Sequence, residues 1–224
     1  MEPADHSLII KRAGVVLVVV GLLDIGVMIY CIANRISYSS SFNIFAVIAG
    51  VFLLRGSLRA ASVVRWLSVF MLAAFLTLIL AWPFFQPWDL TLTEVRLKPW
   101  SAGGAIAFAA IALGLLAWLH SQLGSAPVLA ARAAASRPNR DMRIPAVVGV
   151  GLVVVLAVFL SVLLGGESAS KAKSIAAQQL GEGYRYHVTS LNIQTNSAGK
   201  FVSGVVTAWN DKEVKSVPVR WQER

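Results

Sequence analysis

Long apolar runs fill most of the chain, and a C-terminal stretch in which apolar and polar residues alternate follows them. The clearest run, residues 144–164, has no charged residue and a single hydroxyl group. A helix needs about 20 apolar residues to cross the roughly 30 Å hydrocarbon core of a bilayer, where lipid offers no hydrogen-bond partner to an irregular backbone. The pattern therefore predicts a transmembrane helix over this run.

Four earlier runs predict four more membrane spans. They cover residues 13–33, 40–54, 61–85 and 102–123. The second run is the weakest of them, because only residues 44–54 are fully apolar and the span has to include Ser40, Ser41 and Asn43. The predicted membrane part is therefore an α-helical bundle of five transmembrane helices.

The basic residues give these spans a direction. Nine of them fall on one side of the predicted bundle, and only Arg35, Arg96 and Lys98 fall on the other. The nine are Lys11, Arg12, Arg55, Arg59, Arg65, Arg132, Arg137, Arg140 and Arg143. Cytoplasmic loops carry an excess of Lys and Arg, so the N-terminus is expected in the cytoplasm and the C-terminus outside it. This distribution requires the weak second span.

The predicted organisation has five parts. They are a cytoplasmic arm over 1–12, a four-helix transmembrane bundle over 13–123, a basic cytoplasmic linker over 124–143, a fifth transmembrane helix over 144–166 and an extracytoplasmic domain over 167–224. The composition agrees, because 57% of the residues are hydrophobic and only 14% are charged, whereas soluble domains carry about 25% charged residues.

The last part has the pattern of a small folded α+β domain. Apolar residues at helical spacing from Ser168 to Leu180 predict one helix, with Ser168 as its N-cap and Gly181 at its end. Alternation of apolar and polar residues then predicts a three-stranded antiparallel meander, interrupted by a bulge near Thr189 and Ser190.

Pro218 places the third predicted strand at an edge of the sheet, because proline has no N–H to donate to a neighbouring strand.

Aromatic residues mark a candidate interaction surface in this domain: Tyr184, Tyr186, Trp209 and Trp221. A domain of about 60 residues buries a small fraction of its surface, and one helix does not easily cover this much aromatic area. Exposed aromatic residues often mark a protein interface. We expect the domain to pack against an outer loop, a second copy or a partner; the alternative is an ordinary core with two partly covered sheet faces.

Candidate catalytic residues do not gather in the sequence. The three histidines, His6, His120 and His187, stand far apart, and Cys31 is the one cysteine. The sequence contains no pair of histidines at metal-binding spacing and no phosphate-binding glycine loop. We therefore predict no catalytic, cofactor-binding or metal-binding residues and no cofactor.

Asp24 is the polar residue that most needs an explanation, because a carboxylate inside a membrane span costs several kcal/mol. Its candidate partner is Arg65, near the start of the third span. The pair has two interpretations: a contact that holds two helices together, or a group that handles protons or ions.

These observations predict a non-catalytic protein of a bacterial inner membrane whose periplasmic domain binds another protein, in assembly, scaffolding or envelope sensing. The alternative is a small transporter or channel subunit that uses Asp24 and Arg65. The net charge of +9 does not indicate a nucleic-acid partner, because the basic residues stand at the ends of apolar runs, where topology explains them. The expected partners are the lipid bilayer and a membrane protein, a periplasmic protein or a second copy.

Overall fold

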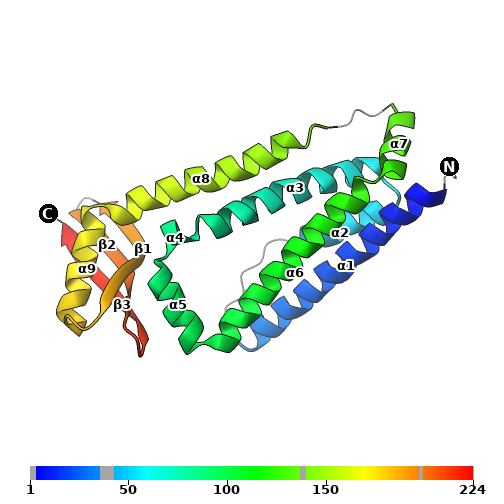
Figure 1. The fold of residues 1–224 in the computed structure, drawn as a ribbon. Helices are drawn as coiled ribbons and strands as arrows, with labels where there is room; N and C mark the ends of the chain where they lie inside the picture. Colours follow the sequence, from blue (N-terminus) through cyan, green and yellow to red (C-terminus); the bar gives the residue numbers. More distant parts are fainter. Residues whose placement is uncertain (1–3, 36–42, 137–139, 197–198, 224) are drawn as a thin grey trace. The chain divides into compact units, whose positions relative to one another are not determined.

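The computed structural model describes residues 4–35, 43–136, 140–196 and 199–223, and Figure 1 shows their elements. The chain is mostly helical and carries a three-stranded antiparallel sheet near its C-terminus. It divides into two compact units. Unit 1 holds Met1–Ala74 and Ala112–Gly149, and unit 2 holds Phe75–Ile111 and Val150–Arg224.

Nine helices lie in the described residues. They are α1 (Ala4–Ala33), α2 (Asn43–Leu54), α3 (Leu58–Leu80), α4 (Trp82–Phe85), α5 (Trp88–Leu97), α6 (Pro99–Leu123), α7 (Ala126–Ala134), α8 (Arg143–Gly165) and α9 (Glu167–Leu180). Four of these helices, α1, α3, α6 and α8, are long and apolar enough to cross a membrane. They match four of the five predicted spans, which is the make-up of a multi-pass membrane protein.

The second predicted span is shorter than expected. Its helix, α2, has 12 residues, and a helix of that length rises about 18 Å, well short of a bilayer core. Ser40 and Ser41 of the predicted span lie outside the described residues.

Several helix boundaries differ from the sequence prediction. α1 begins at Ala4, so most of the predicted arm over 1–12 belongs to the first helix. α3 ends at Leu80, before the predicted end of the third span at residue 85; α4 occupies the last part of that predicted span, and α5 occupies the predicted loop after it. Pro83 lies in the first turn of α4, where no N–H is needed, and Pro87 is the N-cap residue of α5. Asp89 in the first turn and Arg96 in the last turn of α5 complement its dipole.

Glycines bring α1 and α2 close together in unit 1. A Cβ placed on Gly14 would lie 2.8 Å from the backbone nitrogen of Leu54, and one on Gly50 would lie 2.7 Å from Cγ2 of Val18. Gly14 of α1 thus faces Leu54 of α2, and Val18, one turn later in α1, faces Gly50, one turn earlier in α2, so the two helices run antiparallel. The end of α2 consequently lies beside the first half of α1.

The core of unit 1 joins five helices. Its buried residues come from α1, α2, α3, α6 and α7, and include Ile10, Leu53, Val64, Leu123 and Val128. α7, in the predicted linker, therefore packs against the end of α6 and the first part of α1.

The C-terminal domain in unit 2 has the predicted topology. Its strands β1 (Arg185–Asn196), β2 (Gly199–Trp209) and β3 (Val214–Glu223) form a sheet in the order β1-β2-β3. The register of β1 shifts between Val188 and Ser190, which confirms the bulge, and Pro218 lies on the edge strand β3.

Helix α9 covers one face of this sheet. Ala169, Ala172 and Ala176 pack against Val206 and Val219, among other buried residues. Alanines at the contact let the helix approach the sheet closely. The predicted N-cap is wrong: α9 starts at Glu167, one residue earlier, with Gly166 at the cap and no side-chain cap. Gly181 closes the helix with the expected positive φ of 85°.

Candidate functional site

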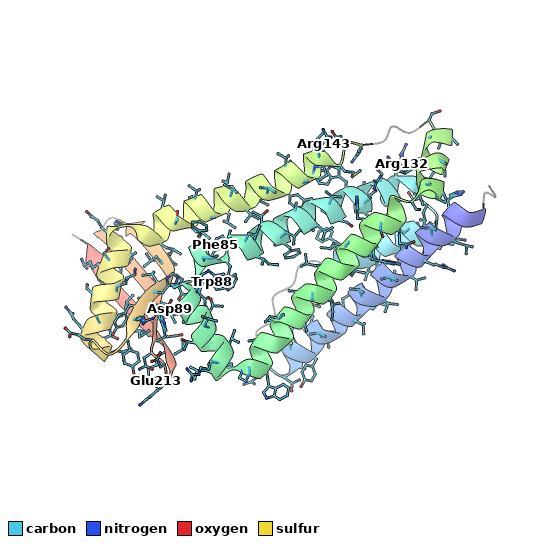
Figure 2. All side chains as sticks on the ribbon, in the orientation of Figure 1. Phe85, Trp88, Asp89, Arg132, Arg143 and Glu213 are labelled. Atoms are coloured by element: carbon cyan, nitrogen blue, oxygen red, sulfur yellow. The ribbon has the colours of Figure 1, made fainter. Side chains whose placement is uncertain are left out.

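The C-terminal domain contacts the α4–α5 segment through two side chains of β1. Nε2 of His187 lies 3.1 Å from the carbonyl oxygen of Phe85, at the end of α4. NH1 of Arg185 donates to a carboxylate oxygen of Asp89, at the start of α5, over 2.5 Å. Figure 2 labels Phe85 and Asp89 on this segment. The domain therefore packs on the α4–α5 segment, which lies between α3 and α6 in the chain.

This contact falls on the sheet face opposite α9. Arg185 pairs with Trp209, and His187 pairs with Thr207, so all four side chains share one face. Trp209 is 5% exposed and Thr207 is 8% exposed. Because α9 lies on the other face, the α4–α5 segment accounts for this burial.

The contact changes the protonation of its ionisable groups. Burial lowers the pKa of His187 below its ordinary value; the hydrogen bond to Phe85 opposes this shift and the positive charge of Lys173 adds to it. The hydrogen bond from Arg185 lowers the pKa of Asp89. His187 is therefore neutral at neutral pH and bonds to Phe85 as the tautomer with the proton on Nε2, while Asp89 is charged, as its ion pair with Arg185 requires.

A cavity of about 470 Å³ opens beside this contact. Asp89, Glu182 and Asp211 contribute three carboxylates to its lining, and Arg185 contributes one cation. Among the described residues, no group of three His, Cys, Asp or Glu side chains is placed to hold a metal ion.

Three of the four aromatic residues of the predicted interaction surface make contacts within the domain, and the fourth, Trp209, is buried under the α4–α5 segment. The hydroxyl of Tyr184 bonds to Glu213, and that of Tyr186 donates to the carbonyl of Gly181. Trp209 is buried, and Nζ of Lys171 lies 5.8 Å from the ring centroid of Trp221.

Glu213 is also bound by Lys215, and this hydrogen bond raises the pKa of Lys215 to about 12.

Trp209 is 5% exposed, so it is part of the covered face of the sheet and not an exposed residue that a partner could bind. A role of the four aromatic residues in binding stays a prediction.

Other apolar residues of the sheet remain open. On the face opposite α9, Phe201 is 38% exposed, Pro218 is exposed and Val205 is half-buried. Val205 pairs with Pro218, and Phe201 lies four residues earlier in β2, so the three share this face. We call Phe201, Val205 and Pro218 the open strip. The sequence did not predict the open strip. The alternation of apolar and polar residues shows which side chains share a face of a strand, but it does not show which part of that face another segment covers.

Asp24 and Arg65 lie at different levels of unit 1. Arg65 follows Val64, which packs in the same cluster as Ile10. Asp24 lies fourteen residues after Ile10 in α1, a helix rise of about 21 Å. Nε of Arg65 is buried and has no hydrogen-bond partner among the described residues. Their pairing, and the transporter alternative that uses it, stay predictions.

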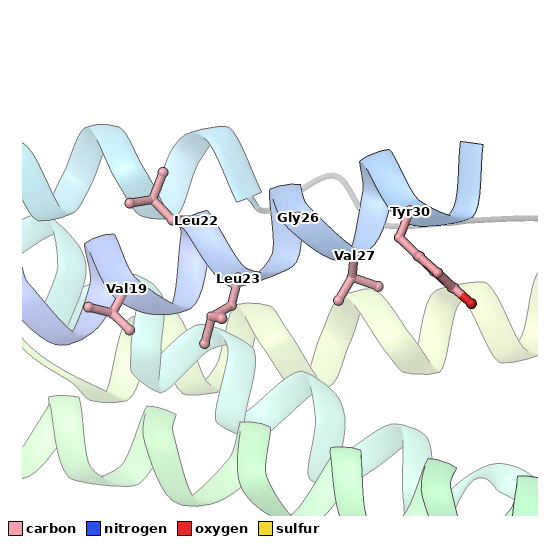
Figure 3. Close-up of a pocket in the computed structure, with 6 residues that line it drawn as sticks. All are labelled: Val19, Leu22, Leu23, Gly26, Val27 and Tyr30. Atoms are coloured by element: carbon pink, nitrogen blue, oxygen red, sulfur yellow. The ribbon is translucent and has the colours of Figure 1, made fainter. Parts of the chain in front are cut away.

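An apolar groove of about 500 Å³ runs along α1, lined by Val19, Leu22, Leu23, Gly26, Val27 and Tyr30 (Figure 3). Its walls carry almost no polar atoms, so it suits hydrocarbon and offers no group for catalysis.

Comparison of the chain with protein-family models, curated proteins and solved structures found no match.

Proposed function

We propose that the chain is a non-catalytic, multi-pass protein of the inner membrane that binds another protein through its C-terminal domain, in assembly, scaffolding or envelope sensing. The half-covered sheet carries this proposal. The α4–α5 segment covers the end of the face that holds Thr207 and Trp209, whereas the open strip stays partly exposed, with Phe201 38% exposed and Val205 half-buried. An apolar surface beside an edge strand suits a protein partner.

The short tether supports a partner at the membrane. Gly166 alone separates α8 from α9, and Leu164 at the end of α8 packs against the core of the domain. A partner of the open strip is therefore a membrane protein, a second copy, or a protein that approaches the membrane surface.

For the topology we propose five crossings, with the N-terminus in the cytoplasm and the C-terminal domain in the periplasm. The antiparallel packing of α1 and α2 supports this number, because the short α2 still ends on the side where α1 begins. Arg55 and Arg59 then lie on the same side as Lys11 and Arg12, as the positive-inside rule requires.

Reporter fusions to the C-terminus test the topology. Alkaline phosphatase, which folds only outside the cytoplasm, is expected to be active there, and green fluorescent protein exported in unfolded form is expected to be dark. The reverse result would exclude the proposed topology.

Photo-cross-linking in intact cells tests the binding function. A photoreactive amino acid at Phe201 is expected to give a covalent adduct of defined mass, and the same group at Gln178, exposed on α9, is the matched control. Co-expression of a copy with a larger tag separates a second copy from another protein. Absence of an adduct at Phe201, or equal adducts at both positions, would contradict a partner at the open strip.

A further inference from the structure

Buried polar atoms without a hydrogen-bond partner gather in unit 1. Among the described residues they include Oγ of Ser62, Nε of Arg65, Nδ1 of His120 and Oγ of Ser125. Buried polar groups in native proteins are nearly always hydrogen-bonded, so an unpartnered group indicates a missing water, ion or ligand. Four such groups on neighbouring elements need a common explanation.

These groups lie around the end of α6. A Cβ placed on Gly124 would lie 3.0 Å from Nε of Arg65 and 2.8 Å from the carbonyl oxygen of His120. Ser125 follows Gly124 directly in the chain. Ser62 is 8% exposed and stands three residues before Arg65 in α3, a spacing that puts both side chains on one face of the helix.

The same place carries positive charge. Ser125 is the N-cap residue of α7, but its side chain makes no cap hydrogen bond; since Pro127 has no N–H, the first turn keeps the N–H groups of Ala126 and Val128 without a side-chain acceptor. The N-terminus of a helix attracts anions through these groups and through its dipole. Arg65 adds its guanidinium beside Gly124, whereas Arg132, which is 3% exposed, lies in the last turn of α7 (Figure 2).

We propose that Ser62, Arg65, Ser125 and the N-terminus of α7 bind the phosphate group of an anionic phospholipid. Hydroxyl, guanidinium and backbone N–H donors are the groups that proteins use for phosphate. The site lies where α6 ends at Leu123, and the ends of membrane helices are the level at which lipid headgroups lie. Inorganic phosphate offers the same oxygens, so the test has to separate the two sources.

The test uses the full chain in a non-ionic detergent, with the melting temperature followed as ligand is added. The ligands are dioleoylphosphatidylglycerol, the zwitterionic dioleoylphosphatidylcholine, and inorganic phosphate. Phosphatidylglycerol is expected to raise the melting temperature progressively once its concentration exceeds the dissociation constant, and phosphatidylcholine is expected to leave it unchanged.

Variants locate the effect. Arg65→Gln is expected to weaken the apparent affinity for phosphatidylglycerol by about tenfold, because one charge-assisted hydrogen bond is lost. Ser62→Ala removes a single hydroxyl with little risk to folding and is expected to weaken it by about threefold to tenfold. The matched control is Arg59→Gln, an exposed arginine of the same helix, which keeps the affinity within about twofold.

Three results would overturn the proposal. Equal loss in Arg59→Gln and Arg65→Gln would mean that the lipid responds to overall charge. Unchanged affinity in Ser62→Ala and Arg65→Gln would place the lipid elsewhere. An equal rise in melting temperature with the same concentration of inorganic phosphate would assign the site to a soluble anion.

Discussion

Nε2 of His187 and the carbonyl oxygen of Phe85 lie 3.1 Å apart although 102 residues separate them in the chain. This hydrogen bond joins the C-terminal sheet to the α4–α5 segment between two candidate membrane helices. The imidazole ring of His187 is partly buried there, and this burial lowers its pKa. Because the ordinary pKa of histidine is 6.5, the contact is sensitive to mildly acidic conditions.

We predict that unit 2 loses stability as the pH falls below 6.5. The pKa of His187 is lower in the folded than in the unfolded chain, so the unfolded chain takes up the proton first. The contribution is complete above the unfolded pKa and is lost as the pH falls through the folded pKa. Thermal melting of the full chain at pH 7.5 and 5.5 measures it.

The control for this prediction is His187→Gln, which keeps a donor but cannot titrate. Its melting temperature is expected to fall less than that of the natural chain between the two pH values. Equal falls would show that His187 does not carry the pH dependence.

Local and long-range features of the fold differ in how far the sequence predicts them. The bulge before Ser190 and the edge position of Pro218 were predicted correctly, because each depends on the alternation or backbone chemistry of a few adjacent residues. The contact of His187 with Phe85 was not predicted, since its acceptor is a backbone carbonyl that any residue could supply.

The candidate site shows the same division. Trp209 was predicted as part of an exposed aromatic surface, but it is 5% exposed, because the α4–α5 segment covers the sheet face that α9 leaves free. The spacing of helical segments indicated that Arg65 lies near the start of a span, whereas its position beside Gly124 depends on packing between α3 and α6.

Two adjacent residues of α5 are predicted to differ sharply in their contribution to stability. Asp89→Ala breaks the ion pair with Arg185, whose side chain is 70% exposed while that of Asp89 is 43% exposed, and is expected to cost less than about 1 kcal/mol. Leu90→Ala is expected to cost about 2–5 kcal/mol, because Leu90 is 2% exposed. Thermal or chemical unfolding of unit 2 compares the variants. A larger loss in Asp89→Ala than in Leu90→Ala would mean that the ion pair, not apolar packing, holds α5 in place.

The contact between α1 and α2 is predicted to tolerate no side chain at Gly50. Gly50→Ala puts a Cβ 2.7 Å from Val18 and 2.8 Å from the carbonyl oxygen of Gly14, so the helices have to separate at a cost of about 1–3 kcal/mol. The control is Gly26→Ala in α1, which meets nothing within 4 Å and is expected to raise helix stability slightly. Melting of the full chain in detergent measures both. Similar changes in the two variants would show that α1 and α2 are not in close contact.

The stability of the C-terminal sheet is predicted to require glycine at position 204, because Ser190 of the bulged strand β1 lies close to it. A Cβ at Gly204 would lie 2.4 Å from the carbonyl oxygen of Ser190, which is backbone and cannot rotate away. Gly204→Ala therefore has to shift β1 against β2, at an expected cost of about 1–3 kcal/mol. Gly183→Ala, in the same domain, meets nothing within 4 Å and is the control. Limited proteolysis of the full chain, with cleavage mapped to residues 185–223, is expected to cut Gly204→Ala faster than the natural chain and Gly183→Ala at the natural rate. Equal rates for the two variants would contradict the close pairing of β1 and β2 at the bulge.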